Sequence, residues 1–527
     1  MTWRHANRYS RALIAVLEDR RWGAVCAFVV AAVAMAPVLH AGFQPEDFGW
    51  LVLGHLSTSP WQLVAHNIDF VYFYRPVPMI FWWLTAHAFG TAAIWHNLAD
   101  ILLQAGNAAL VCLLAARTAR RDSAGWLAGI VFAALPAAAG TAAWQSDRFD
   151  PFALGFSLLA LLAFETALEK KRASPNVGIF LLLALLSKEV AYATAAIMLC
   201  RLATRWLWRR ESPPLLALNV VSAVAAALVL RRITSTTADT YLNMQDSAHA
   251  FVLGALGWWQ QAHAAIGGFL PVPLLFGTVL VVLVAMALVA ALARRQVTPS
   301  TALAWTGCGL LLFPAMLQWP VTSQVLIDEG SRAFTENLRF YYAASAGAAL
   351  LLAAGYSQLQ ARNLRIGMWL GCILWAGFAF HVSRALTTRW AHAWRPLSDA
   401  YLTLGGELEH KSFPPGCRIY LDAPEWPDAF RNYADNIVKS RAAPDAPLQG
   451  CAIFAGELVY QTLVGADRCA AEYWPGLTLT TQHGVVLASR LGDLCFLQFA
   501  TYRQEQLGQP LFRFRVAADG HAREIPD

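Results

Sequence analysis

Apolar stretches about as long as a bilayer is thick recur along most of this 527-residue chain, and they restrict it to a helical membrane fold. A spanning helix needs about 20 apolar residues, because backbone groups in hydrocarbon must bond within their own segment. Only 14% of the residues are charged, against roughly 25% in a soluble protein. The eleven spans that we predict cover residues 22–42, 93–116, 125–143, 151–168, 176–187, 189–205, 214–231, 274–293, 302–319, 340–356 and 365–382.

The fifth and sixth spans are short and meet at Ser187-Lys188-Glu189. A single helix over residues 176–205 would be about 45 Å long, which exceeds the hydrocarbon thickness. We therefore expect a hairpin of two short helices, with the polar triad at its tip.

Basic residues are divided unevenly between the two predicted faces of the membrane. Six segments on one face hold 19 Lys and Arg residues, and the loops on the other face hold about seven. By the positive-inside rule the N-terminus is cytoplasmic, and eleven crossings place the C-terminus outside. Because the basic residues form short scattered clusters, the net charge of +6 does not indicate nucleic-acid binding. The composition suggests a GC-rich bacterium, so we expect a multi-pass protein of a bacterial inner membrane with a periplasmic C-terminal domain.

The last part of the chain differs in character from the spans. From residue 383 charge returns, and strand-like runs occur at 418–421, 477–481, 485–488, 494–499 and 511–516. We therefore expect a cytoplasmic segment (1–21), a transmembrane domain (22–382) and a small soluble periplasmic α/β domain (383–527). Four cysteines of that domain (417, 451, 469 and 495) allow two disulfides in three connectivities. The five cysteines in spans are expected to be apolar core residues.

An acidic pair, Glu46-Asp47, follows the first span at the start of the first outer loop (43–92). Carboxylates at a bilayer boundary are costly unless they are solvated or used. The apolar run 79–83 of the same loop predicts an interfacial helix.

Further polar side chains are predicted at the same face. They lie near the outer ends of spans that are far apart in the chain, which favours a shared cavity over separate ion pairs. Local pairing of each group, such as Lys188 with Glu189, is the alternative. These residues are Arg75, His96, Arg148, Asp150, Lys188, Glu189, Arg339 and Tyr342.

Taken in their order along the chain, these motifs resemble those of the GT-C glycosyltransferases, in particular the protein O-mannosyltransferase-like branch and its bacterial relatives. The likeness covers roughly residues 15–385. Its six segments are Gly42-Phe43 with Glu46-Asp47, Tyr74-Arg75-Pro76, His96-Asn97-Leu98, Trp144 to Asp150, Leu186 to Glu189, and Arg339 to Tyr342.

The resemblance implies transfer of a sugar from a polyprenyl-phosphate carrier to a protein, lipid or polysaccharide acceptor outside the cytoplasm. It also implies that the acidic motif supplies the catalytic carboxylate. We assign Asp47 as general base with Glu46 assisting, and expect an inverting hexosyltransferase that works by one in-line displacement. Arginine and lysine suit the donor phosphate. Arg75, Lys188 and Arg339, then Arg148, are its candidates, and His96, Asp150, Glu189 and Tyr342 would line the substrate cavity.

The chain departs from the family pattern in three respects. Many relatives have two aspartates where this chain has Glu46-Asp47, the tetratricopeptide repeats of some relatives are absent, and the C-terminal domain matches no family domain. Some such transferases use Mg or Mn at the acidic motif. No residue pattern here requires a metal, and this cofactor stays open.

Three other functions would use a similar membrane cavity. A flippase or transporter for lipid-linked saccharides often has internal repeats with paired broken helices, and the two halves of this chain show no convincing repeat. A polymerase or ligase would move whole glycans from a lipid diphosphate. An inactive scaffold would not need Asp47, Arg75 and Lys188 together.

Overall fold

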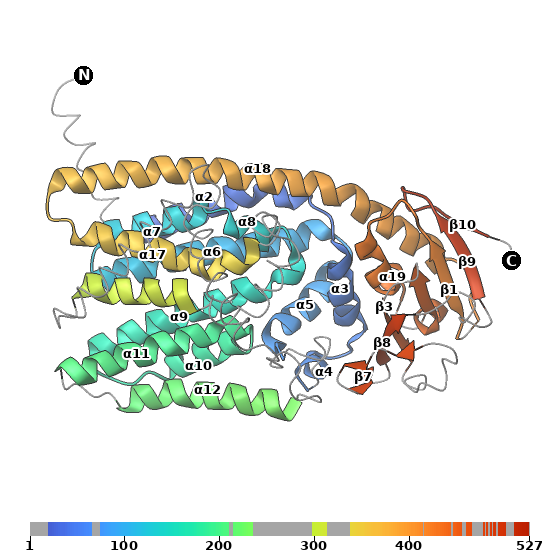
Figure 1. The fold of residues 1–527 in the computed structure, drawn as a ribbon, viewed down its shortest axis with the longest axis horizontal. Coiled ribbons are helices and arrows are strands. Elements are labelled where there is room, and N and C mark those ends of the chain that lie inside the picture. Colours follow the sequence, from blue (N-terminus) through green and yellow to red (C-terminus); the bar gives the residue numbers. More distant parts are fainter. Residues whose placement is uncertain are drawn as a thin grey trace, which may run out of the picture.

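The computed structural model describes residues 19–65, 74–209, 214–234, 298–313 and 338–525, with breaks at 415, 444–445, 456–459 and 466–477 and at several positions from 480 to 510. Long helices form a bundle, and a small domain of strands packs at one end of it (Figure 1). We call this end of the bundle the domain end and the opposite end the far end. This arrangement confirms the predicted fold class, a helical membrane bundle with a small C-terminal α/β domain.

The bundle contains the helices that the apolar stretches predict. Five helices of the described chain are long and apolar enough to cross a membrane: Arg20–His40, Ala93–Ala119, Gln145–Lys170, Pro214–Thr234 and Arg362–Glu409. Of the eleven predicted spans, 274–293 lies outside the described residues, and the other ten coincide wholly or largely with helices. The helices are α2 (Arg20–Met35) with η1 (Ala36–His40), α6 (Ala93–Ala119), α7 (Asp122–Ala134), α8 (Ala137–Ala142), η2 (Gln145–Asp147), α9 (Phe149–Lys170), α10 (Pro175–Leu185), η3 (Glu189–Ala191), α11 (Tyr192–Arg209), α12 (Pro214–Thr234), Pro299–Phe313, η5 (Leu338–Tyr341), α17 (Tyr342–Gln358) and α18 (Arg362–Glu409).

Small residues bring the first helices of the bundle close together. The buried core between α2, α6 and α7 is rich in alanine. A Cβ atom at Gly125 would lie 2.6 Å from the carbonyl oxygen of Cys112, so α6 and α7 could not approach this closely with a larger residue. Close backbone approach through small residues is typical of helix packing in membranes, where van der Waals contact replaces the hydrophobic effect.

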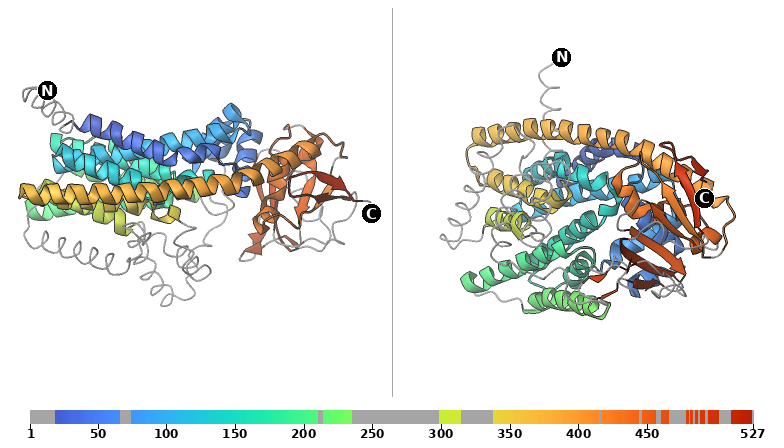
Figure 2. Two further views of the ribbon diagram at one scale, coloured as in Figure 1. Left: turned by 90° about the horizontal axis from the view of Figure 1, so that it is seen from above. Right: turned by 45° about the vertical axis from the view of Figure 1, so that its right-hand side comes forward.

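The helix α18 extends far beyond the span 365–382 that hydropathy predicts. Its 48 residues make it about 72 Å long, more than twice the thickness of a bilayer core. It runs along the whole bundle and continues into the C-terminal domain (Figures 1 and 2). The helix therefore connects the membrane region to the domain without a flexible joint.

The described residues of the first loop form three short helices between the bundle and the C-terminal domain: α3 (Pro45–Leu56), α4 (Pro60–Ala65) and α5 (Pro76–Phe89). The predicted interfacial helix 79–83 is part of α5. Side chains of α3 and α5 share one apolar core with the C-terminal domain, including Phe48, Trp82, Tyr401 and Phe430. The loop that carries the acidic pair is thus packed from both sides.

The described strands of the C-terminal domain form two four-stranded sheets and a two-stranded one. One four-stranded sheet has the order β10-β9-β1-β2, in which β1 (Arg418–Asp422) is parallel to β2 (Ala452–Ala455) and to β9 (Leu511–Val516), and β10 (Ala522–Glu524) is antiparallel to β9. The helix α19 (Asp428–Lys439) connects β1 to β2. The remaining strands are β3 (Tyr460–Gly465), β4 (Thr478–Leu479), β5 (Thr481–Gln482), β6 (Val485–Val486), β7 (Ala488–Leu491) and β8 (Leu494–Thr501). The runs 418–421, 494–499 and 511–516 are confirmed as strands.

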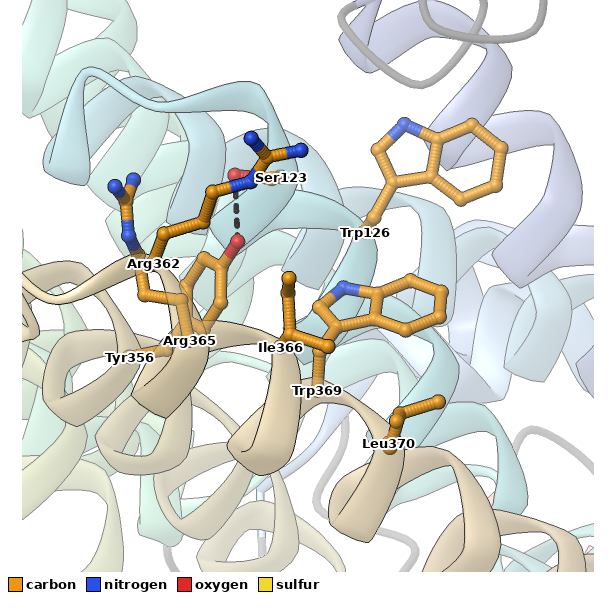
Figure 3. Close-up of a pocket in the computed structure, with 8 residues that line it drawn as sticks. All are labelled: Ser123, Trp126, Tyr356, Arg362, Arg365, Ile366, Trp369 and Leu370. Carbon is orange, nitrogen blue, oxygen red and sulfur yellow. Dashed lines mark hydrogen bonds between the residues drawn. The ribbon is translucent and has the colours of Figure 1, made fainter. Parts of the chain in front are cut away.

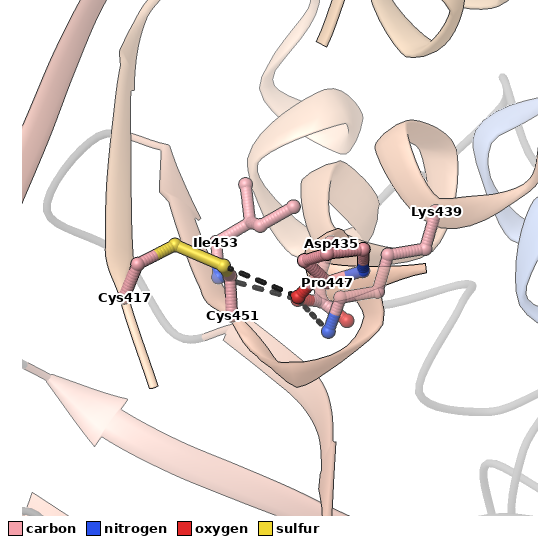
Figure 4. Close-up of a disulfide and its surroundings, with 6 residues drawn as sticks. All are labelled: Cys417, Asp435, Lys439, Pro447, Cys451 and Ile453. Atoms are coloured by element: carbon pink, nitrogen blue, oxygen red, sulfur yellow. Dashed lines mark hydrogen bonds and ion pairs between the residues drawn. A yellow bond between two sulfur atoms is a disulfide. The ribbon is translucent and has the colours of Figure 1, made fainter. Parts of the chain in front are cut away.

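A disulfide between Cys417 and Cys451 joins the start of β1 to the start of β2 (Figure 4). Beside it, the buried carboxylate of Asp435 pairs with Lys439 at 2.9 Å and accepts a hydrogen bond from the Ile453 backbone. Cysteines 469 and 495 lie outside the part of the chain whose side chains are described. The cysteines at 26, 112, 200, 308 and 372 are free.

Replacing Cys417 and Cys451 together with serine should destabilise the domain by about 2–4 kcal/mol, because the crosslink closes a 34-residue separation. The unfolding temperature of the full chain under non-reducing conditions measures this loss. Cys200→Ser, which removes an exposed free thiol, is the matched control. An unchanged unfolding temperature in the double variant would show that the crosslink contributes no stability.

Tryptophans and arginines lie together at the far end of the bundle, as they do at membrane boundaries. A groove of about 420 Å³ there is lined by Trp126 and Trp369, and by Arg362 and Arg365 at its polar side (Figure 3). This pattern agrees with a bilayer surface near the first turns of α18.

Candidate active site at the domain end

The start of the first loop is fixed against α18. The backbone N–H of Phe43 donates a hydrogen bond of 2.9 Å to the Ser398 hydroxyl. A Cβ atom at Gly42 would lie 2.1 Å from the Cβ of Ser398, so only glycine fits this contact. Three residues later Pro45 opens α3 at a position where a missing N–H costs nothing. These contacts determine where the acidic pair begins.

The Asp47 carboxylate is fully buried, and three donors bind its two oxygens. Gln44 donates its backbone N–H at 2.8 Å, as in a capping box, and Ser146 donates its backbone N–H at 2.6 Å and its hydroxyl at 2.5 Å. Burial raises the pKa of Asp47 to about 6, and the bonds from Ser146 and Gln44 oppose that rise. Asp47 therefore ties α3 to the connection before α9.

The Glu46 carboxylate lies in a different environment from its neighbour. It is partly exposed, and none of the described residues donates a hydrogen bond to it. Burial raises its pKa to about 7; Arg339, Arg75 and Lys188 oppose the rise, and Asp47 adds to it. A carboxyl group with a pKa near 7 is suited to take a proton at neutral pH.

Two arginines share one carboxylate next to this group. Arg75 donates to Glu189 through Nε at 3.1 Å and Nη2 at 2.6 Å, and Arg231 pairs with the other oxygen of Glu189 at 3.0 Å. The Arg75 guanidinium also lies 5.1 Å from the centre of the Phe149 ring. Arg75, Arg231 and Glu189 together carry a net charge of +1. Their contacts join the first loop, the tip of the hairpin at Lys188-Glu189 and the end of α12.

Lys188 and Arg339 bring two more cations to the site. The Lys188 ammonium pairs with Asp150 and lies 3.6 Å from Asp147. Arg339 stacks on Trp144, with its guanidinium carbon 3.7 Å from the ring centre. Arg339 and Lys188 both lower the pKa of Glu46, Arg339 more strongly, so both cations lie near the Glu46 carboxylate.

Arg148 precedes α9, is completely buried and is bound by residues of two other helices, α5 and α6. It forms a bidentate pair with Asp100 at 2.7 and 3.1 Å, donates to Thr85 at 3.1 Å, and lies 3.9 Å over the Trp82 ring. His96 also belongs to this group: it lies 3.3 Å from Arg148 through Nδ1 and 3.0 Å from the Gly90 carbonyl through Nε2. These contacts hold α5, α6 and α9 together and give Arg148 a structural role.

Tyr342 lies deeper, inside the bundle. Its hydroxyl accepts a hydrogen bond of 2.9 Å from Asn107 and donates one to Gln104. The side chain is fully buried. The structure thus brings Glu46, Arg75, Asp150, Lys188, Glu189 and Arg339 together at the domain end, and it places His96, Arg148 and Tyr342 in buried networks.

Sequence reasoning missed Arg231, and it assigned no role to Ser146 or Asp147, although both lie in the motif from Trp144 to Asp150. Arg231 had a visible signal, because it ends the seventh span on the face predicted to be poor in basic residues. The pairings of Ser146 and Asp147 had no such signal, since their partners Asp47 and Lys188 are distant in sequence. Among the residues that the structure describes, no three His, Cys, Asp or Glu side chains meet closely enough to hold a metal ion, so we assign no metal ligands.

No protein-family model and no curated protein matches this sequence. Among solved structures, ArnT from Cupriavidus metallidurans in the apo state is 14% identical, with a TM-score of 0.46 over 95% of this chain and 99% of that one. ArnT bound to undecaprenyl phosphate is 15% identical, with a TM-score of 0.45 over 92% and 98%. The archaeal oligosaccharyltransferase AglB from Archaeoglobus fulgidus, with an inhibitory peptide and a dolichol-phosphate, is 12% identical, with a TM-score of 0.45 over 80% and 64%. At these TM-scores neither likeness bears on the chemistry of this chain.

Proposed function

We propose that this chain is a glycosyltransferase that moves a sugar from a polyprenyl-phosphate donor to an acceptor hydroxyl outside the cytoplasm. The observation that carries the proposal is the position of Glu46. A carboxylate with a pKa near 7, to which none of the described residues donates a hydrogen bond, faces three cations at one end of a membrane bundle. The ordered motifs that resemble GT-C enzymes supply the reaction class.

The reaction needs a base on one side of the sugar and positive charge on the other. Glu46 takes the proton of the acceptor hydroxyl, whose oxygen attacks the anomeric carbon. The bond from that carbon to the phosphate oxygen breaks, and the phosphate leaves with the electron pair. One in-line displacement inverts the anomeric configuration, as expected for an inverting hexosyltransferase.

The contacts favour Glu46 as the base and Asp47 as the residue that orients it, the reverse of the roles that the sequence predicts. Both Asp47 oxygens already accept hydrogen bonds, and protonating this carboxylate would disturb the start of α3. Glu46 directly precedes Asp47 on the same turn, and no described residue donates a hydrogen bond to its carboxylate. Asp47 thus acts through Glu46 by fixing the helix from which it projects.

Arg339 and the pair Arg75–Arg231 are the groups that we assign to the donor phosphate. Their guanidinium forks match phosphate oxygens, and their charge stabilises the leaving group. Lys188 sits between two carboxylates and is a weaker candidate than the sequence suggests. The bundle would lie in a bacterial inner membrane with residues 1–21 in the cytoplasm and the C-terminal domain in the periplasm.

Membranes that contain the protein should transfer radiolabelled sugar from a native lipid extract to an acceptor, and Arg75→Ala should raise the KM for the donor roughly tenfold or more. A lost charged hydrogen bond weakens phosphate binding by that order. Arg395→Ala, which removes an exposed cation of a surface pair, should transfer normally. Equal donor KM values for all three proteins would exclude Arg75 from the phosphate site, and no transfer above membranes without the protein would contradict the proposed reaction.

A further inference from the structure

A second charged cavity lies at the far end of the bundle. It has a volume of about 330 Å³ and opens between α6, α9, α11 and the helix Pro299–Phe313. Three threonines, Thr118, Thr204 and Thr298, also line it. Its cations are Arg117, Arg120, Lys171, Arg201 and Arg205.

Two carboxylates compensate only part of this charge. Glu165 pairs with the buried Arg201, which also donates to Thr306 at 3.3 Å. Glu169 pairs with Arg117 at 2.6 Å. Among the described residues no carboxylate pairs with Arg120 or Lys171, so these two cations keep the lining positively charged.

The backbone gives an independent reason to regard this cavity as a site. Among the residues that the structure describes, Arg120 and Lys171 are the non-glycine residues with positive φ, at 53° and 50°. Glycine adopts this conformation without strain, whereas other residues lose about 1 kcal/mol or more. Arg120 ends α6 and Lys171 ends α9, and both line the cavity. Attraction to the helix C-termini favours one cation at each end, and both of these cations also line the cavity.

We propose that this cavity binds a phosphate group, and that a phospholipid headgroup of the adjacent leaflet supplies it. Basic pockets between membrane helices take anionic headgroups, with arginine forks as donors to the phosphate oxygens. The cavity is at the opposite end of α6 and α9 from Glu46, so this site is separate from the candidate active site and does not depend on the proposed reaction.

The test compares the purified full chain with the double variant Arg120→Gly, Lys171→Gly in detergent. Glycine suits both backbone positions, so this variant loses two cations without added strain. Lys170→Gln with Arg172→Gln is the matched control, because it removes two exposed cations from the same turn that do not line the cavity. Unfolding temperatures are measured against increasing phosphatidylglycerol, phosphatidylcholine and inorganic phosphate.

Phosphatidylglycerol should raise the unfolding temperature of the wild type and the control. The variant Arg120→Gly, Lys171→Gly should need a phosphatidylglycerol concentration roughly tenfold higher or more for the same shift. The reason is that each cation near an anionic headgroup contributes on the order of a fewfold in affinity. Stabilisation by phosphatidylglycerol alone assigns the phosphate to a lipid, and stabilisation by inorganic phosphate as well assigns it to a free ion. Equal shifts in the wild type and the double glycine variant, or equal shifts with phosphatidylcholine, would overturn the proposal.

Discussion

Glu46→Gln should lower the rate of sugar transfer by about 100- to 10,000-fold, the usual contribution of a positioned general base. The substitution keeps the shape of the side chain and removes its ability to take a proton. No described residue donates a hydrogen bond to this carboxylate, so the variant should fold and reach the membrane in normal amounts. Glu425→Gln, a change at an exposed glutamate of the C-terminal domain, should leave transfer unchanged.

The pH dependence separates a base from a side chain that only binds. A general base acts when it is deprotonated, and the pKa of Glu46 is raised to about 7. Transfer by the wild type should therefore rise as the pH increases through about 7 and fall below it. The residual activity of Glu46→Gln should lack this rise. The same rise in both proteins, or near-normal transfer by Glu46→Gln, would remove Glu46 from the role of base.

Arg148→Ala should destabilise the protein by about 3–5 kcal/mol, the loss typical of a broken buried ion pair. The change leaves the Asp100 carboxylate buried without its cation and empties the space over the Trp82 ring. Unfolding in denaturant and the amount of protein in membranes both measure the loss.

Two comparisons distinguish a structural Arg148 from a phosphate-binding one. Arg395→Ala should cost at most about 1 kcal/mol, because its pair with Asp399 is exposed. Arg148→Met with Asp100→Leu should recover part of the stability lost in Arg148→Ala, since no unpaired charge remains. Normal stability of Arg148→Ala together with a raised donor KM would instead support the phosphate role that the sequence suggests.

Hydropathy predicts the bundle well because every spanning helix needs about 20 apolar residues. The break at Ser187-Lys188-Glu189 was predictable, since ionisable residues inside an apolar run are too costly for a continuous crossing. The extension of α18 to Glu409 was not, because hydropathy ends where charge returns while helix formation continues. Pro396 even lies inside that helix, and proline normally argues for an end.

Pairings over long sequence distances limited the prediction of the site. Arg148 stands between Asp147 and Asp150 in the sequence, yet its partner is Asp100 in another helix. The difference between Glu46 and Asp47 did have a local signal. Pro45 marks the first turn of a helix, and an acidic residue three positions after the N-cap is the typical capping position, which assigns Asp47 to the backbone.

The most direct test of the proposed reaction is its stoichiometry. Purified protein is supplied with a polyprenyl-phosphate sugar and an acceptor, and the glycosylated acceptor and the released polyprenyl phosphate are both quantified. We predict equal molar amounts of the two products from the wild type and neither from Glu46→Gln. Sugar that crosses a vesicle membrane while still linked to its lipid, with no polyprenyl phosphate released, would contradict a transferase and indicate a flippase.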